Sequence, residues 1–468
     1  MHMACNKSFC SDYILLKPEE VTLFDLLAIL FYRKLDGRRF VECPEGKEFD
    51  FERRWLIFMS VVAQAILQLV KKPMAWMGSF VELWLNLLPT NGGLRGFMLN
   101  LTRGKLVIPK KESAEFMSAI GYVDERVGLD RNIKQDDRRY NGALSIMASK
   151  LAYENEACIK SIVTNHWKME FLGFYDFWND YQDKCTTQAF LLHDKDTKTI
   201  VVSFRGTEPF DADAWCTDAD ISWYELPGVG RIHGGFMKAL GLQKNKGWPK
   251  EIEENNGTAY GHPPPAYYAI RNMLRELLQT NEDTKFIATG HSLGAALAIL
   301  FPAILAMHGE VWMLERLDGV YTFGQPRVGD GEFGKFMKKQ LKEHKIRYLR
   351  YVYCNDMVPR LPMDNAALMF KHFGPCLFYN SLYQGKVIRE EPNKNYFSLS
   401  AAIPMFLNAV WELVRGFILL YIWGPSYKEG WFLKSYRVFG LVVPGLSAHA
   451  PQDYDNITRV GQVLEPTH

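Results

Sequence analysis

The segment Phe286–Leu300, FIATGHSLGAALAIL, joins a short β-branched run, a Gly-His-Ser-Leu-Gly turn and a stretch rich in alanine and leucine. The first part is typical of a strand and the last of a helix. A tight turn between them, with glycines two residues before and two after the serine, would expose Ser292 as a nucleophile. An ordinary glycine-flanked turn is the alternative, because so short a pattern also arises by chance. Its context therefore decides the interpretation.

Short apolar runs alternate with helical stretches around this segment. The strand-like runs, bounded by Gly, Pro, Asn or Asp, are Thr199–Phe204, Phe286–Thr289, Val320–Phe323 and Tyr348–Tyr353. The helical stretches are Tyr267–Leu278, Leu293–Met307 and Gly331–Glu343. This alternation predicts an α/β fold with a mostly parallel central sheet and crossover helices. The turn then opens a helix whose N-terminal N–H groups can stabilise an oxyanion.

A serine nucleophile needs a base that is oriented by an acid, and α/β-hydrolases carry them in the chain order serine, acid, histidine. Asp356 follows the strand-like YLRYVYC after a single asparagine, so we expect its carboxylate at the carboxyl end of a strand. Asp318 precedes its strand, and Asp330 lies in a glycine-rich turn where it can cap the next helix. We therefore predict that Asp356 is the acid.

Three histidines follow Asp356: His372, His449 and His468. His449 lies in the small-residue loop GLSAHAPQDY, after the apolar, strand-like VFGLVV. No strand separates His372 from Asp356, which favours a packed or hydrogen-bonded histidine there. We predict that His449 is the base.

Composition excludes several other classes of protein. The 55 basic and 53 acidic residues leave a net charge of +2, and no basic tract carries interleaved aromatics, so no nucleic-acid partner is expected. The eight cysteines form no CxxC pair, which argues against a zinc site or a disulfide scaffold. HExxH, a P-loop and a dinucleotide-type GxGxxG are absent, so we expect no cofactor or metal. Without a signal-like N-terminus, the cytosolic side is expected.

Two apolar segments near the N-terminus, residues 55–70 and 79–88, carry polar residues spaced by four. Lys71-Lys72-Pro73 separates them, and neither reaches the roughly 20 apolar residues of a bilayer span. We expect two short helices that lie in a lipid interface or enter a monolayer as a hairpin. Two core helices of a helical N-terminal region are the alternative.

A longer apolar block covers residues 401–423, with Glu412 and Arg415 near its middle. Each charge would cost about 2.5–3.5 kcal/mol at a bilayer centre. We expect an ion-paired helix that caps a hydrophobic site or lies on a lipid surface, rather than a transmembrane span.

The chain resembles the class 3 lipases in six ordered blocks, followed by the late histidine. The blocks are FRGT (204–207), WCTD (215–218), IHGGF (232–236), TGHSLGAALA (289–298), TFGQPRVGD (322–330) and NDMVPRLP (355–362). The N-terminal apolar region and the apolar insertion before His449 look most like the plant oil-body triacylglycerol lipases. The resemblance implies an α/β-hydrolase domain over residues 136–468, with an insertion at about 375–435. Residues 1–135 would form a helical region that associates with membranes or lipid droplets.

The resemblance also implies a triacylglycerol lipase that cleaves storage lipid at an oil-body surface, through Ser292, His449, Asp356 and an acyl-enzyme. Thr207 and the Leu293 N–H would form the oxyanion hole. The segment 208–221 would be a mobile lid, unusually acidic, with Trp215 facing lipid. The alternatives are a phospholipase A or galactolipase on membrane lipids, and a non-catalytic, lipase-like scaffold protein.

Overall fold

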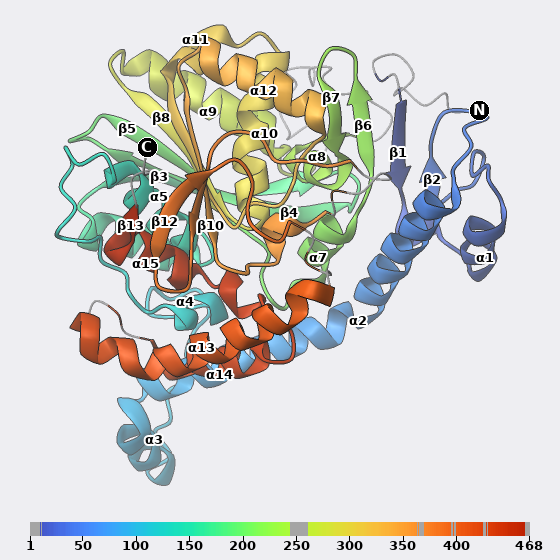
Figure 1. Ribbon diagram of the computed structural model, residues 1–468. Coiled ribbons are helices and arrows are strands. Elements are labelled where there is room, and N and C mark those ends of the chain that lie inside the picture. The colour runs from blue at the N-terminus through green and yellow to red at the C-terminus, as the bar shows by residue number, and fades with distance from the viewer. Residues whose placement is uncertain are drawn as a thin grey trace.

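The computed structural model describes residues 10, 12–243, 261–362, 364, 369–394, 396, 399–424, 427 and 429–463. Within these residues, a nine-stranded sheet forms the centre of the molecule, in the order β13-β12-β11-β10-β9-β8-β5-β4-β3 (Figure 1). Its strands are β3 (Glu170–Asn179), β4 (Lys184–Asp194), β5 (Thr199–Phe204), β8 (Lys285–His291), β9 (Leu317–Phe323), β10 (Arg347–Tyr353), β11 (Cys376–Tyr379), β12 (Gln384–Ile388) and β13 (Gln462–Val463). The run from β5 to β11 is parallel, as predicted.

Helices cover both faces of this sheet, so the sheet separates two hydrophobic cores. One face carries α8 (Gly234–Leu240), α9 (Ala266–Thr280), α10 (Leu293–Met307), α11 (Val311–Arg316) and α12 (Gly331–Glu343). The other carries α5 (Tyr140–Leu151), α6 (Glu156–Ser161), one π-turn (Ile162–His166) and α15 (Pro451–Val460). Side chains alternate between the cores along each strand, since Val202 belongs to the first core and Val201 to the second. The sequence predicted β5, α10 and α12 residue for residue.

The N-terminal region contributes strands as well as helices. β1 (Asp12–Leu16) and β2 (Val41–Glu42) join β6 (Trp223–Leu226) and β7 (Gly230–His233) in a second sheet, in the order β2-β1-β6-β7. Helix α1 (Leu23–Phe31) and a 3-10 turn (Pro18–Glu20) lie between β1 and β2. The sequence indicated only helices here, because a five-residue strand whose partner lies more than 200 residues away leaves little local signal.

The two short helices expected before residue 90 are instead one helix, α2 (Phe51–Thr90), which runs through Pro73. A proline inside a helix costs about 3 kcal/mol. Contacts at both ends offset that cost: Ser60 Oγ donates to Ala219 O (2.7 Å), and Asn86 Nδ2 donates to Met117 O (2.8 Å). Of the polar residues spaced by four, Ser60, Gln64 and Asn86 are buried against the protein, whereas Gln68 is exposed. Helix α2 is about 60 Å long.

The insertion before His449 forms α13 (Leu399–Trp423) and α14 (Trp431–Gly440), which run along the same side of the molecule as α2 (Figure 1). Helix α4 (Ala119–Val123) contacts both α2 and α14, and α3 (Gly93–Thr102) projects beyond them. Remaining elements are α7 (Ala212–Ala219) and 3-10 turns at Val358–Arg360 and Ser447–His449. By length and composition alone, α2 and the Ala402–Trp423 part of α13 could cross a membrane.

Helix α13 is ion-paired, but its charges bind other elements rather than each other. Arg415 contacts Asp453 of α15 (2.7 Å), and Glu412 contacts Arg437 of α14 (3.5 Å). All four side chains are buried, and Glu429 completes the cluster by binding Arg437 (2.6 Å). The insertion is thus bound through charges to the helix that follows His449.

Candidate active site

Ser292 occupies a strained turn between β8 and α10. Its φ of 59° and ψ of −128° lie outside the regions that a side-chain-bearing residue ordinarily adopts. A Cβ at Gly290 would lie 2.2 Å from the Gly294 carbonyl carbon, and one at Gly294 would lie 2.2 Å from Phe204 O. Only glycine fits at these two positions, as a nucleophile elbow requires. Strain of this kind clusters at functional sites.

Asp356 and His449 form a hydrogen-bonded pair although 93 residues separate them. His449 Nδ1 lies 2.8 Å from Asp356 Oδ2. Asp356 is fully buried on the loop after β10, where its Oδ1 accepts from the Val358 N–H (2.9 Å). Its Oδ2 also accepts from the Tyr454 hydroxyl (2.5 Å). These bonds fix the orientation of the carboxylate beside the imidazole.

The serine turn and the Asp356–His449 pair meet at the end of β9. The Ser292 N–H donates to Phe323 O (3.0 Å), and Gly324 follows that residue. A Cβ at Gly324 would lie 2.8 Å from His449 Cε1 and 3.0 Å from Asp356 Oδ2. Among the described residues, the buried Nε2 of His449 has no hydrogen-bond partner. That nitrogen is the one that takes a proton from a serine in an Asp-His-Ser arrangement.

His291 and Tyr153 hold the backbone of His449, and sequence reasoning did not identify either residue. His291 Nε2 lies 2.9 Å from His449 O, and the Tyr153 hydroxyl lies 2.9 Å from His291 Nδ1. Burial lowers the pKa of His291 well below its usual value, so the ring is neutral. Because a carbonyl only accepts, Nε2 carries the proton and Tyr153 donates to Nδ1. The sequence offered one signal for His291, because this histidine directly precedes the predicted nucleophile, Ser292.

The FRGT turn lies directly against the serine turn. A Cβ at Gly206 would lie 2.5 Å from His291 O, and one at Gly294 would lie 3.0 Å from the Arg205 carbonyl carbon. The Leu293 N–H opens α10, so it has no acceptor within that helix. Thr207 and Leu293 are both buried beside the elbow. The structure thus brings together the two residues predicted for the oxyanion hole.

Helix α7, within the segment 208–221, contacts this site. The Thr207 hydroxyl donates to Asp218 Oδ2 of α7 (2.7 Å), a contact that sequence reasoning did not predict. Burial raises the pKa of the Asp218 carboxyl to about 7. Ser292 is only 7% exposed. Trp215, expected to face lipid, is half-buried, and its Nε1 donates to Pro209 O (3.2 Å).

The other candidate residues have structural partners elsewhere. His372 is buried with Nε2 2.6 Å from Pro359 O, and burial lowers its pKa to about 3. Asp330 accepts from the Phe333 N–H (2.9 Å) and caps α12. Asp318 forms ion pairs with Lys285 and Arg347 at the far end of the sheet. His468 lies outside the described residues.

The strand order and the serine turn at the centre of a parallel sheet define an α/β-hydrolase. The sequence model of the lipase (class 3) family matches residues 201–366. Relatives named triacylglycerol lipase OBL1 match along nearly the whole chain. The Arabidopsis thaliana protein is 42% identical over 97% of this chain and 96% of its own length, and the Ricinus communis protein 38% identical over 97% and 96%.

Among solved structures, the Rhizomucor miehei triacylglyceride lipase is 23% identical, with 50% of this chain and 77% of that chain covered and a TM-score of 0.35. The two plant relatives establish what the family model indicates over a shorter span: the chain belongs to the class 3 lipases. It is therefore a carboxylic ester hydrolase.

Proposed function

We propose that this chain hydrolyses triacylglycerol at the surface of lipid droplets, with Ser292 as nucleophile. The observation that carries the proposal is the Asp356–His449 pair: the His449 ring lies against His291, which directly precedes Ser292, and its Nε2 has no hydrogen-bond partner among the described residues. The plant relatives are named triacylglycerol lipases, which supports this substrate.

The proposed reaction is acyl transfer through a covalent intermediate. His449 Nε2 takes the proton of the Ser292 hydroxyl while the oxygen attacks the ester carbonyl, and Asp356 stabilises the imidazolium. The N–H groups of Thr207 and Leu293 stabilise the tetrahedral oxyanion. The protonated His449 then gives its proton to the departing alcohol oxygen. A water molecule, deprotonated by His449, releases the fatty acid from Ser292 in the same way.

An apolar surface supports action at a lipid interface. Large exposed side chains include Leu69, Trp76 and Phe80 on α2, Ile403, Leu407 and Ile422 on α13, and Trp431 and Phe439 on α14. Exposed apolar surface gathered on one side of a protein marks an interaction site. Because the opposite side of α2 is bound to the protein, the helix is suited to lie along a lipid monolayer rather than to cross a bilayer.

Two measurements test the proposal. Wild type and Ser292→Ala are assayed on emulsified trioleoylglycerol and on phosphatidylcholine vesicles; we expect wild type to cleave the emulsion and the variant to lose more than 99% of that activity. Equal activity of the two proteins would overturn the mechanism, and cleavage of the vesicles alone would replace triacylglycerol by phospholipid. For the surface, flotation with droplets should be lost when Leu69, Trp76 and Phe80 are replaced by serine. Retained flotation would reject this docking face.

A further inference from the structure

Helix α3 is held at its base by one buried asparagine. The chain leaves α2 through Gly92 and Gly93, whose φ angles of 77° and 79° are ones that glycine adopts readily. Asn91 Nδ2 donates to Val107 O (2.8 Å), and Asn91 Oδ1 accepts from the Val107 N–H (3.1 Å) and from Asn100 Nδ2 (3.1 Å). The segments before and after α3 are thus joined at Asn91, which gives this projecting helix a defined orientation.

The side of α3 that points away from Asn91 is apolar and exposed. A Cβ on Gly96 would lie 2.0 Å from Asn91 O, so this glycine marks the side that faces the base of the helix. About half a turn away, Leu94 is 67% exposed, Met98 53% and Leu101 51%. Spacings of four and three residues put these three side chains on one face. None of the residues of α3 is buried, so the described part of the chain leaves this face open to solvent.

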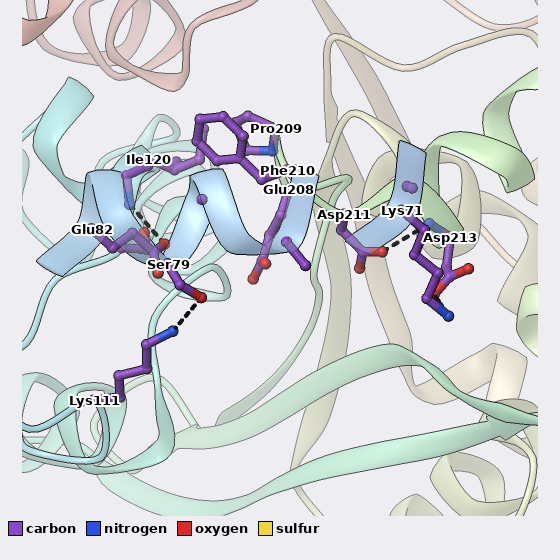
Figure 2. A pocket seen from close by; sticks show the side chains of 15 residues that line it. Lys71, Ser79, Glu82, Lys111, Ile120, Glu208, Pro209, Phe210, Asp211 and Asp213 are labelled. Carbon is purple, nitrogen blue, oxygen red and sulfur yellow. Dashed lines mark hydrogen bonds and ion pairs between the residues drawn. The ribbon is translucent and has the colours of Figure 1, made fainter. Parts of the chain in front are cut away.

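The charges in and after α3 are all positive. Between Thr90 and Lys111 the chain has no acidic residue, although its net charge as a whole is only +2. Lys111 Nζ donates to Ser79 Oγ (2.9 Å), which is neutral (Figure 2). All the basic residues of this segment are exposed, and in the described part of the chain none of them forms an ion pair. They are Arg95, Arg103, Lys105, Lys110 and Lys111.

The neighbouring helices offer apolar surface with little exposed charge. Helix α3 projects beyond α13 and α14 (Figure 1). The charged residues of α13, Glu412 and Arg415, are buried in ion pairs with other elements. On α14, Arg437 is buried as well, and Lys434 lies over the Phe417 ring (4.4 Å). Recognition of a charged headgroup on this side of the molecule therefore falls to α3 and the residues that follow it.

We propose that α3 and residues 103–111 bind anionic phospholipids of the droplet monolayer. The apolar face enters between the headgroups, and the basic side chains bind their phosphate and carboxylate oxygens. This inference rests on the proposed function, because the monolayer is the surface at which the chain is proposed to act. A helix with leucine and methionine on one face and basic residues beside them is suited to a lipid interface.

Positive charge gives this segment a preference among lipid surfaces. Each basic residue near an anionic surface strengthens binding roughly fivefold, and salt screens this attraction. A neutral monolayer offers the apolar contact without that gain. The segment therefore distinguishes anionic from neutral monolayers, which the apolar face of α2 alone does not.

The test compares a charge variant with a control that removes the same charge elsewhere. The charge variant combines Arg95→Gln, Arg103→Gln and Lys105→Gln. The control combines Lys338→Gln, Lys339→Gln and Lys342→Gln, which are exposed lysines of α12. Helices α12 and α3 lie at opposite ends of the molecule (Figure 1). A third variant, Leu94→Ser with Leu101→Ser, tests the apolar face, and thermal melts establish that each protein is folded.

The readout is flotation with squalene droplets coated by diether phosphatidylcholine, with and without added diether phosphatidylserine. Neither coat contains a carboxylic ester, so hydrolysis does not change the surface. We expect wild type and the control to bind the anionic coat roughly tenfold more tightly than the neutral coat, or more, and the charge variant to lose most of this gain. The apolar variant should bind both coats more weakly. Added salt should weaken wild-type binding to the anionic coat alone, which tests the inference without any variant.

Equal binding of wild type to the two coats would overturn the inference, and so would a control that loses as much as the charge variant. A charge variant that keeps its preference for the anionic coat but no longer binds polyglutamate would replace the lipid by an acidic protein. Failure of the proposed function looks different. In that case trioleoylglycerol is not cleaved, or Ser292→Ala keeps wild-type activity, whichever coat the protein prefers.

Discussion

The hydroxyl of Tyr454 donates a hydrogen bond to Oδ2 of Asp356, the same oxygen that His449 Nδ1 contacts. Tyr454 belongs to α15, the helix that begins just after His449. One short segment thus supplies both the predicted base and a second donor to its acid.

Replacing Tyr454 by phenylalanine should slow the chemical step. The carboxylate loses one of its oriented donors, and a hydrogen bond to a charged group is worth about 1.5–3 kcal/mol. We expect kcat to fall roughly 10- to 100-fold with KM little changed, measured on emulsified trioleoylglycerol. Tyr436→Phe is the matched control, because its hydroxyl donates to Leu446 O instead. Equal losses in both variants would mean that Tyr454 has only a packing role.

Thr207 allows a second test, which concerns the hydrogen bond from its hydroxyl to Asp218 of α7. Thr207→Val keeps the shape but loses the bond to Asp218, which leaves a buried carboxyl without its donor. We expect kcat/KM to fall roughly 10- to 100-fold, and Thr207→Ser to keep most of the activity. A serine variant as weak as the valine variant would show that the hydroxyl bond to Asp218 alone does not account for the activity.

Glu154 should make the protein less stable as pH rises towards neutrality. Burial raises the pKa of this carboxyl to about 7, although Ser118 donates two hydrogen bonds to it. An unfolded glutamate titrates near about 4.3. The protonated form therefore stabilises the fold fully below pH about 4, and this contribution is lost as pH rises to about 7.

The variant Glu154→Gln should lose less stability than wild type between pH 4 and 7, by denaturant titration at each pH. Asp218, whose pKa is raised to about 7 for the same reason, keeps some of the slope in both proteins. Identical pH profiles would mean that folding does not raise the pKa of Glu154 above its unfolded value.

Arg415 should be essential for folding around the insertion. Two buried guanidinium groups, those of Arg415 and Arg437, form ion pairs with Asp453. The substitution Arg415→Met removes the first of them. Breaking a buried ion pair from one side costs about 3–5 kcal/mol. We expect the unfolding midpoint to drop by several degrees at least, by calorimetry, whereas Arg95→Met on the exposed surface of α3 should change it little. A drop of the same size in both variants would contradict this role.

The central strands, α10 and the order Ser292, Asp356, His449 could be read from the sequence because each has a local signal. β5 is a run of mostly apolar residues, α10 is rich in alanine and leucine, and Asp356 comes three residues after the end of β10. Contacts between distant segments carry no such signal. The bond from Tyr454 to Asp356 spans 98 residues, and that from Tyr153 to His291 spans 138.

Helix α2 shows why local rules fail even for a long element. Lys71-Lys72-Pro73 is typical of a helix end, yet the helix continues because Ser60 and Asn86 bind the protein on either side of the proline. Tertiary contacts outweighed a local preference worth about 3 kcal/mol. The spacing of four predicts one polar side of the helix, and Ser60 and Asn86 on that side bind the protein itself.

The insertion lies between Asp356 and His449 in the sequence. Its buried charged side chains form ion pairs with α15, the helix that follows His449. Arg415 and Arg437 both reach Asp453, one residue before Tyr454. A truncated chain without α13 and α14 would bury Asp453 with neither cation beside it. Loss of the apolar insertion would therefore also disturb α15, the helix from which Tyr454 donates to Asp356.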